Sequence, residues 1–124
     1  MTDIKTIDEF IERHKSGIRI FTGLEFEHGE SFSGLDITGT VFKNCWFCAD
    51  FSNTNLTDCK FIDSNIKTSD FSNANLTRAE IKGCAVESTG YKGAIITDFI
   101  FENNPAYGNR LDLNDFKRIY GFEK

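Results

Sequence analysis

The chain has 124 residues and a net charge of −5 at pH 7, and 40% of its residues are hydrophobic. This composition excludes a disordered chain, and no apolar run approaches the roughly 20 residues that a transmembrane helix needs, which excludes a membrane-spanning protein. The acidic balance argues against a direct nucleic-acid binder that coats phosphates, and the polar N-terminus, which has no signal-peptide core, predicts a cytoplasmic protein.

The N-terminal segment is expected to form a short helix that covers one end of the molecule. The stretch from Thr6 to Glu9 reads as a capping box, in which both side chains satisfy backbone N–H groups at the start of a helix. Four residues share one helical face: Ile7, Phe10, Ile11 and His14. Gly17 is placed to end this helix, and Ile18 and Ile20 alternate as a short strand behind it.

The middle of the chain repeats every five residues, starting at residue 49. The third place of each unit is large and apolar: Phe51, Leu56, Phe61, Ile66, Phe71, Leu76, Ile81, Val86, Tyr91 and Ile96. The first place is small: Ala49, Thr54, Cys59, Ser64, Ser69, Ala74, Ala79, Cys84, Thr89 and Ala94. Neither a helical period of 3.6 nor a strand period of 2 gives this pattern. A period of five predicts a chain that turns a corner every five residues, with a small and a large side chain pointing inward.

Longer-range similarity predicts four sides. The stretch DFSNTNL at residue 50 is nearly identical to DFSNANL at residue 70, and more distant copies begin at 31 and 90. The spacings of 19, 20 and 20 residues leave one residue missing between Ile37 and Phe51. Stacking every fourth unit gives four columns: Phe32, Phe51, Phe71 and Tyr91; Ile37, Leu56, Leu76 and Ile96; Phe42, Phe61, Ile81 and Phe101; and Phe26, Phe47, Ile66 and Val86. Equivalent residues then lie about 4.8 Å apart, as neighbouring strands do.

These units resemble the pentapeptide-repeat family, whose pattern is A(D/N)LXX. The segments ANLTR at 74–78 and ADFSN at 49–53 match that pattern outright, and the resemblance covers roughly residues 24 to 101. It implies an all-β solenoid, namely a right-handed quadrilateral parallel β-helix of about four coils with a short α-helix at each end. We expect one domain, with a capping helix and strand in 1–23, repeats in 24–103, and a turn and helix in 104–124.

The stretch CWFC at residues 45–48 has the spacing of a redox pair or of half a metal site. In the five-residue register, however, Cys45 takes a small inward position, whereas Trp46 and Cys48 point outward. This unit has four residues, so the missing residue most simply falls here. Cys45 and Cys84 are two coils apart, about 10 Å on sheet spacing, which is too far for a disulfide. We therefore expect reduced, structural cysteines, with Cys48 as an exposed thiol.

The C-terminal segment offers four apolar residues on a short helix: Leu113, Phe116, Ile119 and Tyr120. This helix follows Pro105 and Gly108, and it is expected either to seal the last coil or to pair two subunits. Family members often dimerise through their C-terminal ends, so the resemblance favours a homodimer, while the residues are equally compatible with a sealed monomer.

Outward positions must carry any binding function. The outward apolar residues are Trp46, Val41, Ile62 and Ile95, and exposed aromatic residues often dominate interfaces. Asp50 below Asp70 places two like charges about 4.8 Å apart, which could form an anionic patch. The predicted partner surface therefore comprises Trp46, Asp50, Asp70, Val41 and Ile62.

The family resemblance implies one specific activity. Some members resemble B-DNA in width and charge, bind DNA gyrase and thereby confer quinolone resistance. Residues 24–103 hold 12 acidic and 6 basic residues, a balance of −6, so the sign agrees with such mimicry. The basic residues, however, are scattered over all four sides, and four coils make a rod only about 20 Å long.

Enzyme chemistry finds no support in the sequence. Neither His14 nor His28 belongs to a recognisable catalytic constellation, and a rod filled with stacked side chains has no large pocket. We therefore expect no catalysis, no cofactor and no metal. The sequence favours a scaffold that binds a protein, with gyrase mimicry as the alternative.

Overall fold

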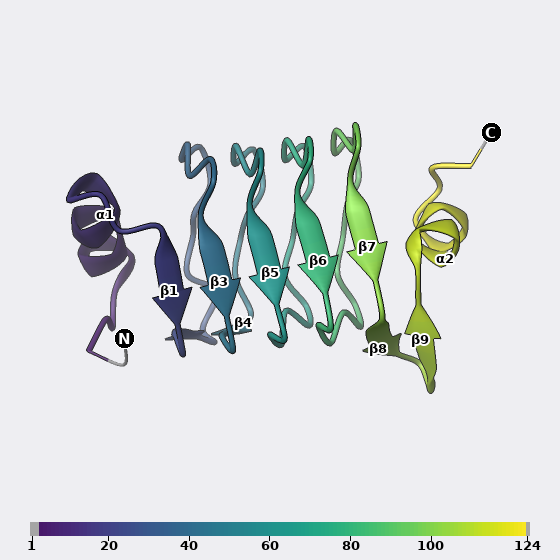
Figure 1. Cartoon of the computed structure of the whole chain (residues 1–124), viewed down its shortest axis with the longest axis horizontal. Coiled ribbons are helices and arrows are strands. Elements are labelled where there is room, and N and C mark those ends of the chain that lie inside the picture. Colours follow the sequence, from purple (N-terminus) through teal and green to yellow (C-terminus); the bar gives the residue numbers. More distant parts are fainter. Residues whose placement is uncertain (1–2, 124) are drawn as a thin grey trace.

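The computed structural model describes residues 3–123 as a rod of stacked coils with a helix across each end (Figure 1). Its elements are α1 (Ile7–Lys15), β1 (Ile20–Thr22), β2 (Glu25–Phe26), β3 (Val41–Lys43), β4 (Trp46–Phe47), β5 (Lys60–Ile62), β6 (Glu80–Lys82), β7 (Ile100–Glu102), β8 (Asn104–Ala106), β9 (Asn109–Leu111) and α2 (Leu113–Ile119). The strands are short because the chain turns a corner about every five residues. Within residues 3–123, neither helix has the length and apolar character needed to cross a membrane.

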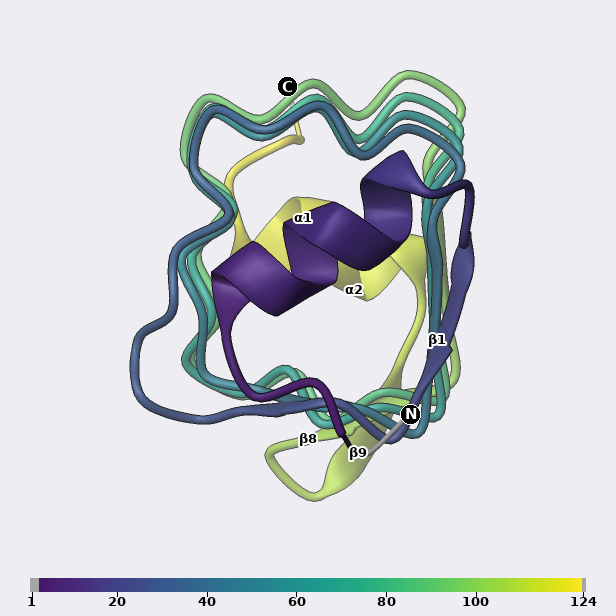
Figure 2. The same cartoon turned by 90° about the vertical axis from the view of Figure 1, so that its left-hand side faces the viewer.

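Seen along the rod, each coil is roughly square (Figure 2). We name its four faces by their inward columns: face A (Phe32, Phe51, Phe71, Tyr91), face B (Ile37, Leu56, Leu76, Ile96), face C (Phe21, Phe42, Phe61, Ile81, Phe101) and face D (Phe26, Phe47, Ile66, Val86). Face C is a five-stranded parallel sheet in the order β1-β3-β5-β6-β7, and face D begins with the parallel pair β2-β4. The predicted right-handed quadrilateral β-helix is confirmed, and all four predicted columns are present.

The core consists of side chains stacked on their equivalents in the next coil. On face A the ring centroids of Phe32 and Phe51 are 4.5 Å apart, those of Phe51 and Phe71 are 5.1 Å apart, and those of Phe71 and Tyr91 are 5.3 Å apart. The rings are nearly parallel, with interplanar angles of 12°, 3° and 5°. Parallel coils enforce this arrangement because they superpose equivalent residues.

At most corners the backbone is left-handed two residues after the inward residue, and the corners after Phe26 and Phe47 are the exceptions. Between faces A and B, for example, Asn73 has φ 58° and Gly93 has φ 74°. Asparagine and glycine adopt this conformation at lower cost than other residues. An acid or amide before the inward residue supports the turn, because Asp70 Oδ1 accepts a hydrogen bond from Ser72 N at 2.9 Å. This geometry explains the polar second place of the repeat.

Coil length varies at one corner. Three register pairs define the lengths: Phe26 with Phe47, Trp46 with Asn65, and Asp50 with Asp70. The two residues of these pairs are 21, 19 and 20 positions apart, where a regular coil has 20 residues. The first coil therefore has one extra residue, near Gly29, and the second coil lacks one residue directly after Phe47. The first coil bulges at this corner (Figure 2), and Gly29 N donates to Cys48 O at 2.9 Å. The predicted position of the missing residue, inside the CWFC unit, is confirmed.

The N-terminal cap follows the prediction in its helix but not in its strand. Thr6 Oγ1 accepts a hydrogen bond from Glu9 N at 3.1 Å, and Gly17 follows the helix with φ 103°. In the strand, Ile20 is 53% exposed and Phe21 is fully buried. The expected inward alternation of Ile18 and Ile20 was therefore wrong by one residue, because Phe21 extends the column of face C.

The fully buried Phe10 of α1 closes the N-terminal opening of the rod. Its ring centroid lies 4.7 Å from that of Phe21, 5.1 Å from that of Phe32 and 6.0 Å from that of Phe42. These rings belong to faces A and C, so that one side chain contacts opposite walls of the first coils.

The C-terminal segment contains a hairpin where a simple turn was expected. Strands β8 and β9 pair antiparallel, and β8 continues the path of face D. The fully buried Asn104 starts this hairpin: its Nδ2 donates to Ile81 O at 2.9 Å, and its Oδ1 accepts from Cys84 N at 2.9 Å. The hairpin is thus joined to the last coils through a buried amide.

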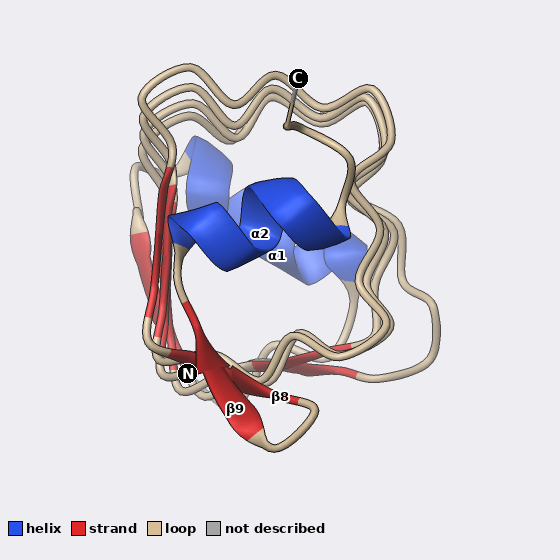
Figure 3. Cartoon of the chain, turned by 90° about the vertical axis from the view of Figure 1, so that its right-hand side faces the viewer, coloured by secondary structure: helices blue, strands red, loops and turns tan. Residues whose placement is uncertain are grey.

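Helix α2 lies across the last coil (Figure 3). Asp112 caps it in a capping box with Asp115. Phe116 is fully buried, and its ring centroid lies 4.7 Å from that of Tyr91 and 5.0 Å from that of Phe101. The helix therefore seals the rod.

Candidate functional site

The five residues of the predicted partner surface lie on three different faces. Val41 and Ile62 are half-buried on face C, Trp46 is exposed on face D, and Asp50 and Asp70 lie on face A. The structure therefore brings the two aspartates together and separates them from the apolar residues. The corner after Phe47 lies between Trp46 and Asp50.

The carboxylates of the two aspartates are hydrogen-bonded within their own turns. They face each other across neighbouring coils, and each carboxylate accepts a hydrogen bond from the backbone N–H two residues on, Asp50 from Ser52 at 2.8 Å and Asp70 from Ser72 at 2.9 Å. Hydrogen bonding from the Ser52 side chain, and to a smaller extent from its backbone N–H, lowers the pKa of Asp50. Because these bonds stabilise the charged carboxylates, the close pair does not require a cation or a partner.

Glu80 of face C is paired with two lysines. Glu80 lies 3.7 Å from Lys60 Nζ and 3.2 Å from Lys82 Nζ. Ile62 pairs with Lys82 in the next strand, and Val41 pairs with the exposed Ile20 in the previous one. Lys60 and Glu80 thus pair across neighbouring coils. The apolar residues of this face are interspersed with lysines and do not form a continuous patch.

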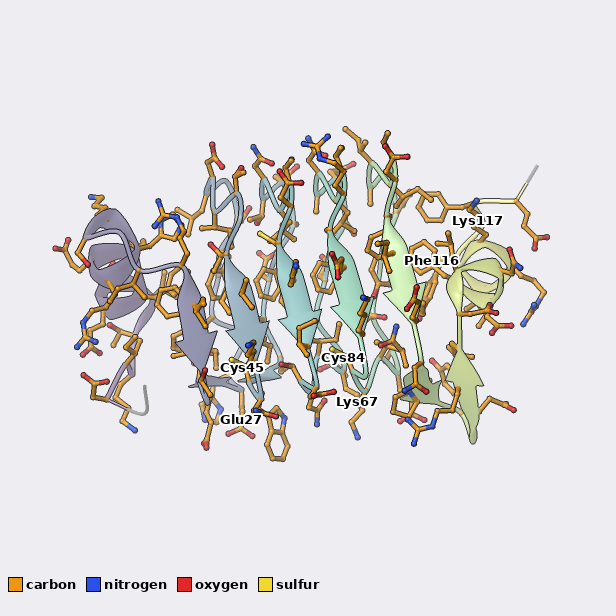
Figure 4. The ribbon with its side chains drawn as sticks, viewed as in Figure 1. Glu27, Cys45, Lys67, Cys84, Phe116 and Lys117 are labelled. Carbon is orange, nitrogen blue, oxygen red and sulfur yellow. The ribbon has the colours of Figure 1, made fainter. Side chains whose placement is uncertain are left out.

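Face D has the most exposed aromatic side chain of the repeats. Trp46 is 50% exposed and lies between Glu25 of the previous coil and Asn65 of the next. In Figure 4, Glu27 and Lys67 project from the same side of the rod, whereas Cys45 and Cys84 lie within it. Trp46 is therefore accessible and surrounded by polar side chains of both charges.

Open hollows flank this face at both ends. One, of about 240 Å³, is lined by Ile4, Lys5, Gly23, Glu25, Glu27 and His28. The other, of about 580 Å³, lies beside the hairpin and is lined by residues including Glu87, Pro105, Tyr107 and Arg110. Face D therefore presents an exposed tryptophan between two depressions.

Sequence reasoning missed Tyr107, which is 57% exposed at the hairpin. Its N–H donates to Glu87 Oε2 at 3.0 Å, and its hydroxyl accepts from Ser88 N at 3.1 Å. The signal was present, since Tyr107 follows Glu87 by 20 residues, the length of a regular coil. Predicting a simple turn from Pro105 and Gly108 hid that continuity.

Cys45, Cys59 and Cys84 are buried in the core, and the inward position predicted for Cys45 is confirmed. Burial raises the pKa of Cys45 to about 11 and that of Cys59 and Cys84 to about 12. All four thiols are free. Cys48 is less exposed than expected, because it is half-buried and its Sγ accepts a hydrogen bond from Thr68 Oγ1 at 3.0 Å. Within the described part of the chain, no three metal-ligating side chains gather into a site.

The C-terminal residues divide between the seal and the surface. Phe116 is fully buried, Leu113 is half-buried, and the half-buried Tyr120 shares a hydrogen bond with Thr89 Oγ1 at 3.1 Å. Ile119 is 43% exposed. Three of the four predicted residues thus pack toward the rod, and Ile119 is the one available for a subunit contact, which stays a prediction.

Comparison with known proteins finds similarities in sequence and in fold. A family model described as pentapeptide repeats matches residues 49–85 with 8 copies. The quinolone resistance pentapeptide repeat protein QnrB96 of Scandinavium goeteborgense is 34% identical over 103 residues, which cover 74% of this chain and 46% of the relative. The structure of QnrB1, a plasmid-mediated fluoroquinolone resistance protein, is 22% identical with a TM-score of 0.60, covering 71% of this chain and 54% of that one.

A pentapeptide repeat protein from Nostoc is 24% identical over 84% of this chain and 82% of the other, with a TM-score of 0.49. The chain spans about half the length of the quinolone resistance proteins it matches. The five-residue repeat, the square coils and the family match agree. Residues 49–85 are pentapeptide repeats, and the chain is similar to a pentapeptide-repeat protein over a longer stretch of 103 residues.

Proposed function

We propose that this chain is a non-catalytic scaffold that binds a protein partner through face D, with Trp46 as its main contact. The observation that carries the proposal is the 50% exposure of Trp46 between two hollows. Tryptophan is enriched among the residues that dominate interface energies, particularly where neighbouring groups can exclude water from it.

The other faces support this choice by contrast. The acids of face A accept hydrogen bonds from their own turns, and Glu80 of face C pairs with Lys60 and Lys82. On face B, Arg78 forms an ion pair with Asp58 at 2.8 Å. Face D carries Glu25 and Glu27, whose side chains form no ion pair or hydrogen bond with any residue in 3–123.

A matched pair of variants tests the proposal. Trp46→Ala removes the exposed side chain of face D, and Ile95→Ala removes a side chain of equal exposure, 51%, from the opposite face B. In affinity capture from lysate of the source organism, we expect Trp46→Ala to lose a specific partner that Ile95→Ala retains, with binding weakened at least about tenfold. Equal capture by both variants would remove Trp46 from the interface.

A second candidate function follows from the relatives. The similarity to QnrB96 over 103 residues favours a quinolone resistance activity, which for this family implies binding to DNA gyrase as a mimic of DNA. We propose this as the alternative, with Asp50 and Asp70 as the acidic pair that would stand in for neighbouring phosphates. Both functions require the chain to work in the cytoplasm, as the sequence predicts.

A supercoiling assay separates the two candidates. A mimic should inhibit gyrase, or protect it from a quinolone, and the effect should weaken with added salt and in an Asp50→Lys, Asp70→Lys variant. Trp46→Ala should retain the effect, because Trp46 lies on another face. If gyrase is unaffected by the chain at all concentrations, the alternative is withdrawn and the scaffold proposal stands on the capture experiment.

A further inference from the structure

The last coil has an open backbone edge on faces A and B. In the coil before it, four N–H groups donate to carbonyls of the last coil, all at 2.8 Å: Phe71 to Gly90, Asn73 to Lys92, Leu76 to Ile95, and Arg78 to Thr97. The equivalent donors of the last coil are Tyr91, Gly93, Ile96 and Asp98. None of these four N–H groups has an acceptor within residues 3–123.

The sequence of the last coil leaves still more donors unpaired. In the previous coil, Asp70 and Asn75 provide side-chain acceptors for the N–H groups of Ser72 and Thr77. Gly90 and Ile95 replace these two residues in the last coil and have no side-chain oxygen. The N–H groups of Lys92 and Thr97 therefore also lack an acceptor in the described part of the chain.

The acceptors of the edge are open as well. Ser69 O accepts from Gly90 N at 3.2 Å, and Ala74 O accepts from Ile95 N at 2.9 Å. The equivalent carbonyls of the last coil, those of Thr89 and Ala94, accept no backbone hydrogen bond within 3–123. The edge thus presents donors and acceptors in the spacing that one more parallel coil would satisfy.

Helix α2 covers the centre of the last coil but leaves space beside this edge. A hollow of about 510 Å³ is lined by Ile96, Thr97, Asp98 and Phe99 of the coil and by Leu113, Lys117 and Phe122 of the cap. Leu113 and Phe122 are half-buried there. The hollow can accept a large apolar side chain from a strand lying on the edge.

We propose that this edge binds an extended peptide segment of a partner protein, which runs parallel to the last coil and inserts an apolar side chain beside Leu113 and Phe122. Open sheet edges are normally covered or blunted, and strand addition is a recurring mode of peptide recognition. The carbonyls of such a segment accept from Tyr91, Gly93, Ile96 and Asp98, and its N–H groups donate to Thr89 and Ala94. This site is separate from face D, and its test does not depend on Trp46.

Amide hydrogen exchange with a synthetic peptide tests the site directly. The probe has the sequence SDFSNANLTR, that of residues 69–78, which already form the required edge in the structure. At a concentration ten times its Kd, the peptide should slow exchange at Tyr91, Gly93, Ile96 and Asp98 about tenfold. The amides of Phe71 and Leu76, already bonded to the last coil, should not change.

A matched control peptide carries N-methyl groups at the positions of Asp70 and Asn75, which removes the two N–H groups that donate to the edge. Protection of the four amides by the first peptide and not by the second would support the proposal. Equal protection by both, or by neither, would overturn it. Protection that appears without peptide as the protein concentration rises would assign the edge to a second copy of the chain and would also overturn it.

Discussion

Both ends of the rod are closed by a short helix, but the two helices are connected to the coils in different ways. At each end one phenylalanine of a short helix fills the opening: Phe10 contacts Phe21, Phe32 and Phe42, and Phe116 contacts Tyr91, Phe99 and Phe101. The N-terminal helix leads directly into β1, whereas the C-terminal helix follows a hairpin joined to the last coils through Asn104. A square coil lined by aromatic residues thus needs one large apolar side chain at each end.

In a stacked-repeat protein each coil contacts only its neighbours, so that a cap acts first on the coil beside it. We therefore predict that the two ends of the rod unfold separately. We also predict that the C-terminal end depends on the buried amide of Asn104.

Truncating the two closing side chains should have the largest effect. We expect Phe10→Ala and Phe116→Ala each to lower the free energy of unfolding by about 3–5 kcal/mol, because both side chains are fully buried among aromatic rings. Urea denaturation measures this loss. Hydrogen exchange should rise first in the coil next to the altered cap. A cost below about 1 kcal/mol would mean that the helix does not seal that end.

Removing the buried amide should weaken only the C-terminal end. Asn104→Ala leaves Cys84 N and Ile81 O without their partners, so we expect a loss of about 2–3 kcal/mol in urea denaturation. Asn114→Ala, an exposed change on α2, is the control and should cost no more than about 0.5 kcal/mol. Equal effects of the two changes would show that the amide bonds contribute nothing specific.

The N-cap residues of the two helices should contribute similar amounts to the free energy of unfolding. Thr6 accepts from Glu9 N at 3.1 Å, and Asp112 accepts from Asp115 N at 3.0 Å. Thr6→Ala and Asp112→Ala should each cost about 1 kcal/mol by the same denaturation measurement. If only one has an effect, the other helix is held by its phenylalanine alone.

Thiol labelling should report which end opens, with no effect on stability itself. At pH 8 the buried thiols of Cys45 and Cys84 stay protonated because burial raises their pKa values to about 11 and about 12. In the unaltered protein, labelling should be confined to Cys48. Phe116→Ala should accelerate labelling of Cys84 more than that of Cys45, and Phe10→Ala should do the reverse. Labelling of Cys84 as fast as Cys48 without any substitution would contradict the buried assignment.

Much of the repeat region follows from the sequence because each inward residue recurs at a fixed interval. The columns of faces A to D, the inward Cys45 and the missing residue after Phe47 are all present as predicted. The strand at Ile20 was displaced by one residue because it lies before the first complete coil, where no repeat sets the register. The hairpin at Tyr107 escaped prediction because its turn residues suggested that the repeat had ended.

The candidate surfaces were harder to predict. The sequence identifies outward residues, but it does not show that Asp50 and Asp70 are hydrogen-bonded to their own turns, or that Trp46 lies on a different face from them. These relations depend on distances between coils and on the shortened corner after Phe47, and a five-residue pattern does not contain them.

The sequence by itself determined the period, the four faces and the composition of the core, because a solenoid converts a repeat in sequence directly into a stack in space. Only the tertiary structure decided how Phe10 and Phe116 close the ends, which carboxylates are already bonded, and which backbone groups of the last coil lack partners. The physical reason is that an end or an open edge lies where a coil has no neighbouring coil to pair with. A local pattern specifies what each coil can pair with, and the assembled rod decides which coil has no neighbour.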